Sequence, residues 1–116
     1  MTIDHRQVNE VMVIALGGKM MGGTDAARFY DELREWIRQG YRRFVIDLGG
    51  ADWMNSSGLG MLISGLKTIR EFQGNLRLAR IPEKIRSVLE ITKLVTVFSM
   101  NDTTEEAVSS MVQNRE

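Results

Sequence analysis

The apolar and polar positions divide the chain into alternating extended and helical stretches. Residues 3–7 and 10–16 are predicted strands, and the second of them contains the continuously apolar run from Val11 to Leu16. Such a run, partly β-branched, is typical of a strand that is covered on both faces. No helical pattern separates the two strands, so we expect a hairpin. Gly17-Gly18 and Gly22-Gly23 then predict a loop.

Two longer stretches carry apolar residues at helical spacing. The first helix is predicted to have Thr24 as its N-cap and to stop at Gly40. Phe44-Val45-Ile46 is a second buried strand closed by residues 47–50, and the second helix that follows stops at Gly74. The apolar positions of the two helices are Ala26, Phe29, Tyr30, Leu33, Trp36 and Ile37, and then Leu59, Leu62, Ile63, Leu66, Ile69 and Phe72.

The last third of the chain continues the alternation. Leu76 to Ile81 reads as a strand, Pro82 fits the first position of a short helix, and Val95 to Phe98 predicts the last strand. The sequence Thr103-x-x-Glu106 is a capping box that opens a C-terminal helix. Strands that alternate with helices imply βαβ crossovers. We therefore predict a single α/β domain over residues 1–116, with a mixed sheet of about five strands and about four helices.

The composition narrows the range of functions. The chain has 15 basic and 15 acidic residues, and this balance gives no electrostatic case for nucleic acid, whose binding proteins carry a basic patch. Cysteine is absent and His5 is the single histidine, so we expect no structural metal and no disulfide. The longest apolar run has six residues, against the ~20 of a bilayer span. With a polar N-terminus and no secretory signal, the chain is expected to be soluble and cytoplasmic, without a membrane partner.

The most informative segment, Asp47 to Gly60, runs from a buried strand through a short loop into a helix. Ligands and partners of open α/β sheets gather at the carboxyl ends of the strands. Ser56 and Ser57 stand where an N-cap belongs, and helix capping alone is one interpretation of this pair. Gly58 and Gly60 each cost about 1 kcal/mol of helix stability relative to alanine. We expect a tight backbone turn or the close approach of a second molecule to offset that cost.

The same segment resembles the signature of a known family. Asp47-Leu48, followed by Trp53-Met54-Asn55-Ser56-Ser57-Gly58-Leu59-Gly60, resembles the STAS domain as found in bacterial anti-sigma factor antagonists. The resemblance covers nearly the whole chain and includes the early strand pair, the glycine-rich turn and the late Leu89-x-x-x-x-Leu94-x-x-x-Phe98 pattern. It implies a small α/β domain that works by binding and not by catalysis, with no cofactor.

The resemblance also implies a mechanism and a set of site residues. In the family, a partner that is both anti-sigma factor and serine kinase phosphorylates the first serine of the motif, which is Ser56 in this chain. The unphosphorylated form binds that partner and frees the sigma factor, and a PP2C-type phosphatase resets the switch. The expected partner-binding residues are Met21, Met54, Asn55, Ser56, Ser57, Gly58, Leu59 and Gly60.

Asn55 departs from the family pattern, which most often has aspartate at this position. Asparagine keeps the shape and hydrogen bonding but drops the charge that would help to position or activate the serine. This residue favours an alternative hypothesis, in which the chain is a STAS subunit of a larger sensory or transport-regulating assembly and is never phosphorylated.

A third hypothesis is a small hydrolase or phosphotransferase that uses Asp47 or Asp52. The sequence offers it no base, metal cluster or cofactor motif, so we expect no enzyme and expect Asp47 to accept hydrogen bonds near the signature segment. Trp53 is a candidate anchor for a partner. The methionines expected at the same end of the sheet, where flexible thioethers suit an adaptable surface, are Met20, Met21, Met54 and Met61.

Overall fold

The computed structural model describes residues 1–113 of the chain. Its strands are β1 (Thr2–Val8), β2 (Val11–Met20), β3 (Arg43–Met54), β4 (Asn75–Ala79) and β5 (Ser99–Asn101). They form one sheet in the order β1-β2-β3-β4-β5. The hairpin pair β1 and β2 is antiparallel, whereas every other neighbouring pair is parallel. The predicted mixed α/β sheet is confirmed.

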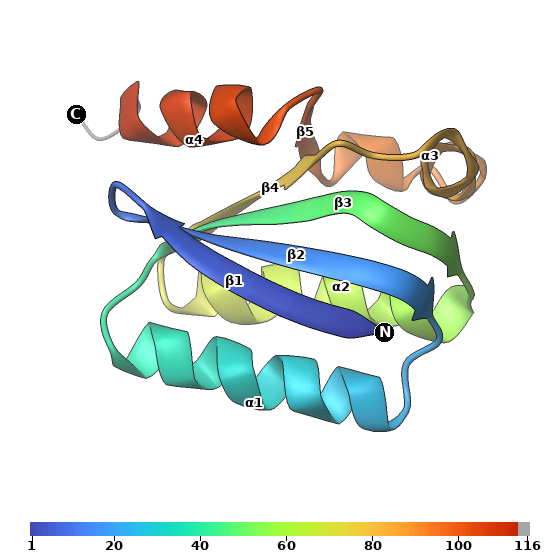
Figure 1. Cartoon of the computed structure of the whole chain (residues 1–116), viewed down its shortest axis with the longest axis horizontal. Coiled ribbons are helices and arrows are strands. Elements are labelled where there is room, and N and C mark those ends of the chain that lie inside the picture. Colours follow the sequence, from blue (N-terminus) through green and yellow to red (C-terminus); the bar gives the residue numbers. More distant parts are fainter. Residues whose placement is uncertain (114–116) are drawn as a thin grey trace.

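Helices cover both faces of the sheet (Figure 1). They are α1 (Thr24–Arg38), α2 (Ser56–Glu71), α3 (Glu83–Ile91) and α4 (Thr104–Gln113), with a short 3₁₀ turn, η1 (Leu94–Thr96), after α3. In the view of Figure 1, α1 and α2 lie below the sheet and α4 lies above it. The molecule is thus a single α/β domain with two layers of helices around one sheet, as the alternating pattern predicts.

Strand β2 shows why its sequence is apolar without interruption. Met12, Ile14 and Leu16 belong to the larger apolar cluster, which α1 and α2 close from one side. Val11 and Val13 belong to a smaller cluster on the opposite face, which Ala107, Val108 and Met111 of α4 close. Successive side chains of a strand point to opposite faces of the sheet. A strand between two helical layers therefore needs apolar residues at even-numbered and odd-numbered positions alike.

The glycine pairs of the two central strands are not loops, which corrects the prediction. Gly17 and Gly18 lie within β2, where they pair with Gly50 and Ala51 of β3, and both strands continue to Met20 and Met54. The pairing is irregular on either side of the glycines. Glycine is a weak strand former, but here glycines of one strand lie opposite small residues of the next, so the ladder continues past them.

Other element boundaries also differ from the prediction. Residues 95–98 do not form a strand: η1 occupies 94–96, and the last strand starts only at Ser99. Leu94 and Val95 pack against the larger cluster and Phe98 is buried in it, so the apolar run reflects the packing of a turn. The N-cap of α1 is Gly23 and not Thr24. Pro82 is the N-cap of α3 and not its first helical residue, which is Glu83. The Thr103 capping interaction is confirmed, since its Oγ1 accepts a hydrogen bond from the Glu106 N–H at 3.0 Å.

Candidate functional site

The second half of the signature segment, from Met54 to Gly60, begins where the two central strands end together. Met20 of β2 lies opposite Met54 of β3 in the parallel ladder. The next residue, Asn55, donates its backbone N–H to the carbonyl oxygen of Met20 at 3.2 Å, and α2 begins at Ser56. The start of α2 is therefore fixed to the carboxyl end of β2, the edge of an α/β sheet where binding sites gather.

Asn55 is the N-cap of α2, and this corrects the prediction that Ser56 or Ser57 caps the helix. Asn55 has an extended backbone, and its Oδ1 accepts a hydrogen bond from the Gly58 N–H at 2.9 Å. Its carbonyl oxygen accepts the first helical bond, from the Leu59 N–H at 3.0 Å. Asparagine and serine are both strong caps, but only one residue can occupy the position. Both serine hydroxyls are thereby left without a role in the cap.

The cap makes a prediction about stability. Replacing Asn55 with alanine should cost about 1 kcal/mol of unfolding free energy, because the Gly58 N–H loses its acceptor. Asn55→Asp should cost nothing, since a carboxylate keeps the acceptor and its charge interacts favourably with the helix dipole. Urea denaturation of the two variants beside the wild type measures both values. An alanine variant as stable as the wild type would show that the cap contributes nothing.

The two glycines of the first turn have different roles. A Cβ on Gly58 would collide with the carbonyl oxygen of Met20 and would lie 2.8 Å from the carbonyl carbon. A Cβ on Gly60 would meet nothing within 4 Å. The close approach expected at Gly58 is thus the approach of this chain's own β2. No contact within the described residues explains Gly60, which leaves open space at the surface of the first turn.

Ser56 and Ser57 are both exposed. Neither hydroxyl forms a hydrogen bond with any residue of the range 1–113. Ser57 lies against the loop that follows β2: a Cβ built on Gly22, whose φ is +80°, would lie 2.7 Å from the Cβ of Ser57. The residues from Ser56 to Gly60, which we call the α2 tip, therefore present two unengaged hydroxyl groups and one open glycine to solvent.

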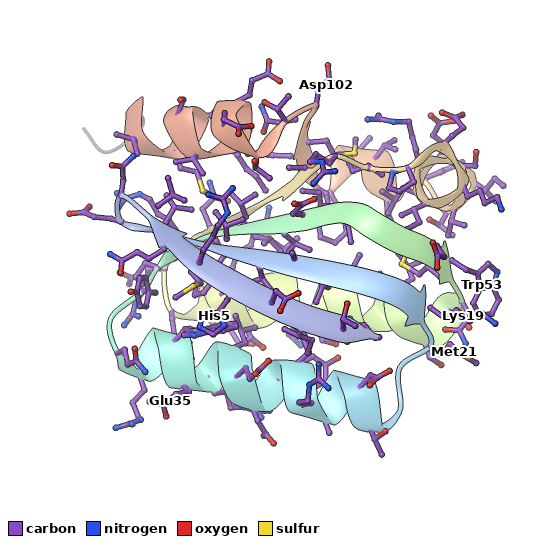
Figure 2. The ribbon with its side chains drawn as sticks, in the orientation of Figure 1. His5, Lys19, Met21, Glu35, Trp53 and Asp102 are labelled. Atoms are coloured by element: carbon purple, nitrogen blue, oxygen red, sulfur yellow. The ribbon has the colours of Figure 1, made fainter. Side chains whose placement is uncertain are left out.

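Exposed apolar side chains lie at the same end of the sheet. Met21 is 50% exposed and Trp53 is 45% exposed, and Figure 2 shows both near Lys19, where β2 and β3 end. The other predicted methionines of this end, Met20, Met54 and Met61, are buried in the core.

The predicted partner-binding residues therefore divide by exposure. Ser56, Ser57 and Met21 are exposed, whereas Met54, Gly58 and Leu59 are buried. Asn55 and Gly60 are half-buried. The buried members of this set pack the start of α2 against the sheet and offer little side-chain surface to a second protein.

Asp47 is held by hydrogen bonds within the sheet. Its Oδ1 accepts from the Gly49 N–H at 2.8 Å, as the sequence predicted for a backbone donor. Its Oδ2 forms an ion pair with Arg80 Nη1 at 3.1 Å. The Arg80 guanidinium fills the space above Gly49, where a Cβ would collide with it. Arg80 has a left-handed backbone, with φ 54°, and no motif in the sequence points to it. This carboxylate is thus engaged in structural contacts.

The acidic side chains and the single histidine are dispersed over the described part of the fold. Across residues 1–113, no group of three or more His, Asp or Glu side chains is arranged to hold a metal ion. His5 (Figure 2) packs beside Trp36, with ring centroids 5.2 Å apart. In the same range, every helix is too short or too polar to cross a bilayer.

Comparisons with known proteins agree with the sequence signature. The family model of the STAS domain matches residues 2–107. A protein from Bordetella bronchiseptica named as an anti-sigma factor antagonist, BtrV, is 28% identical over 110 residues, which are 95% of this chain and 94% of the relative.

Solved structures share the fold. The crystal structure of a protein from Thermotoga maritima named as an anti-sigma factor antagonist superposes with a TM-score of 0.84 at 23% identity, over 93% of this chain and 92% of that one. The structure of the Bacillus cell fate determinant SpoIIAA in its phosphorylated form superposes with a TM-score of 0.74 at 20% identity, over 95% of this chain and 99% of that one.

Proposed function

The chain belongs to the STAS domain family, and on that basis we propose that it is an anti-sigma factor antagonist switched by phosphorylation of Ser56. In this proposal, the unphosphorylated chain binds an anti-sigma factor that is also a serine kinase, and the sigma factor is released. Phosphorylation of Ser56 ends the binding, and a PP2C-type phosphatase restores it. All of these steps take place in the cytoplasm.

The observation that carries the proposal is the exposed Ser56 at the first position of α2. A phosphoacceptor must be reachable by a kinase, and its modification must not unfold the protein that carries it. Asn55 already caps the helix, so the Ser56 hydroxyl is free to react without loss of the cap. The support from relatives is that the protein from Bordetella bronchiseptica, similar along 94% of its length, is named as an anti-sigma factor antagonist.

The α2 tip is suited to accept a phosphate without damage to the fold. A phosphoserine adds about −1.5 to −2 charges. The backbone N–H groups of Ser56 and Ser57 lie in the first turn of α2 and have no hydrogen-bond acceptor within the helix. The amides and the helix dipole stabilise an anion at this place. Asn55, being neutral, adds no repulsion of its own to the new charge.

The same phosphate would oppose docking. Burying a hydrated dianion against a partner without matching cations costs several kcal/mol. A micromolar complex is held by roughly 8 kcal/mol, so a loss of this size abolishes it. Phosphorylation would thus act by electrostatics and desolvation at one contact, with the scaffold unchanged.

Asn55 supports an alternative in which the chain is never phosphorylated and serves as a scaffold subunit of a larger sensory or transport-regulating assembly. Its side-chain oxygen accepts a hydrogen bond from the Gly58 N–H. The residue therefore has a structural role that needs no charge. The family most often has aspartate at this position. With asparagine, the charge that would help to position or activate Ser56 for a kinase is missing.

A phosphorylation assay separates the two proposals. Incubation with a serine-kinase anti-sigma factor from the same organism and Mg-ATP should add one phosphate, which peptide mass spectrometry should place on Ser56. Ser56→Ala should abolish the incorporation, and the matched variant Ser57→Ala, which removes the neighbouring exposed hydroxyl, should retain it. If the wild type binds the kinase but takes up no phosphate, the scaffold alternative is favoured.

A further inference from the structure

One exposed stripe of α2 connects Ser56 with the far end of the helix. Its members follow each other at spacings of four and three residues, which places them on one side of a helix. They are Ser56, Gly60, Ile63, Lys67 and Arg70. All are exposed except Gly60, which is half-buried. At 1.5 Å per residue, this α2 stripe is about 21 Å long.

The second half of the α2 stripe borders a groove. The groove has a volume of about 390 Å³ and is lined by Ile63, Leu66, Lys67, Arg70, Glu71 and Val97. Val97 comes from the segment after η1. Ile63 and Val97 are each 37% exposed, although apolar side chains of this size are usually buried. The groove therefore offers an apolar floor between two elements.

Basic side chains stand at the rim of this groove without partners. Lys67 and Arg70 form no ion pair with any residue from 1 to 113. Two exposed arginines of α1 differ: Arg34 pairs with Asp31 at 3.5 Å and Arg38 pairs with Glu35 at 2.7 Å. The hydrogen bond from Arg38, with a smaller one from Gln39, lowers the pKa of Glu35 from its ordinary value. The groove lining also holds one carboxylate, Glu71, against these two cations. The cations of the α2 stripe are thus in excess and available to carboxylates from outside the chain.

A stable protein interface uses about 20–30 residues on each side, many more than the α2 tip contains. We propose that the docking surface for the anti-sigma factor extends along the whole α2 stripe, and that its occupant is an acidic amphipathic helix of that partner. Apolar side chains of the helix enter between Ile63 and Val97, and its carboxylates meet Lys67 and Arg70. This inference rests on the proposed function, because it assigns a surface and a chemistry to the same partner.

The stripe arrangement also explains the open Gly60. It lies between the phosphoacceptor and the groove, and a Cβ at this position would meet nothing within the described chain. A partner helix laid along α2 can come nearest to the backbone at a residue without a side chain. The phosphate on Ser56 would then stand at the end of the same contact, where acidic groups of the partner add repulsion.

Charge reversal of the groove rim tests the inference. The probe is a purified serine-kinase anti-sigma factor from the same organism that binds the wild-type chain. The double variant Lys67→Glu with Arg70→Glu should weaken binding about 30-fold at low salt and should reduce its dependence on salt, because acidic groups of the partner then face acidic groups. Ile63→Ser should weaken binding by about tenfold through the apolar contact. Biolayer interferometry measures both, and circular dichroism checks the fold.

The matched control is Arg28→Glu with Lys84→Glu, which makes the same change of net charge at two exposed cations of α1 and α3 that likewise form no ion pair within residues 1–113. It should bind within about twofold of the wild type. Equal weakening by both double variants would overturn the inference, since net charge would then explain the effect. Wild-type affinity of the Lys67/Arg70 variant, together with loss of binding by Ser56→Glu, would overturn the inference but leave the proposed function intact.

Discussion

Replacing Ser56 with glutamate should lower the affinity for the anti-sigma factor at least ~100-fold while the domain stays folded. The carboxylate would stand at the first position of α2, where amides and the helix dipole stabilise a negative charge in the free protein. On docking, the same charge must lose its water against a surface that has no cation for it, which costs several kcal/mol. Isothermal titration calorimetry with the purified anti-sigma factor gives the affinity, and thermal unfolding gives the stability.

Ser56→Ala is the control for this variant, because it removes the hydroxyl without adding charge. It should bind like the wild type and should resist inactivation by kinase and ATP. A Ser56→Glu protein that captures the anti-sigma factor as well as the wild type does would contradict the proposed switch. So would a Ser56→Glu protein that is unfolded, since the proposal requires the scaffold to tolerate the charge.

Replacing Gly58 with alanine should destabilise the domain by about 3 kcal/mol or more, or prevent its folding. The added methyl group would collide with the backbone of Met20, and backbone cannot rotate away as a side chain does. Overpacking in a filled interior typically costs about 1–3 kcal/mol. A displacement of α2 that relieved the collision would also stretch two hydrogen bonds, the one between Asn55 and Gly58 in the cap and the one between Asn55 and Met20. Urea denaturation, or the soluble yield where the variant does not fold, measures the loss.

Gly60→Ala provides the matched control two residues away in the same turn. A Cβ there meets nothing within 4 Å, and alanine favours the helix over glycine by about 1 kcal/mol. This variant should therefore be as stable as the wild type or more stable. Destabilisation of both variants to a similar degree would show that the collision with Met20 is not the cause.

The sequence allows the fold to be predicted from periodicity, because each buried strand and each helical stripe keeps its own spacing. It also allows Ser56 to be singled out, through the resemblance that the family match confirms. The assignment of the cap was wrong because asparagine and serine satisfy the same hydrogen bond, and only the backbone conformation of Asn55 decides between them. The mistaken loop at Gly17-Gly18 arose because pairing with another glycine-bearing strand is a non-local property.

The role of Gly58 was beyond local sequence reasoning for a related reason. The atoms that require a glycine belong to Met20, at the end of another strand, and spacing along the chain does not show that neighbour. Arg80 is a similar case, since it follows the end of β4 and contacts Asp47 in the neighbouring strand β3. The sequence marks Gly58 as costly for a helix but does not mark Arg80, and in both cases only the three-dimensional arrangement gives the reason.

The contact between Gly58 and Met20 limits how recognition can evolve in this molecule. Two of the five residues from Asn55 to Leu59, the cap and the first glycine, are committed to joining α2 to β2. A cell that carries several such domains cannot insulate its signalling pathways from each other by changing these positions. Under the proposed function, discrimination between paralogous partners must instead accumulate at positions that the scaffold leaves unconstrained, and Lys67 and Arg70 are two such positions.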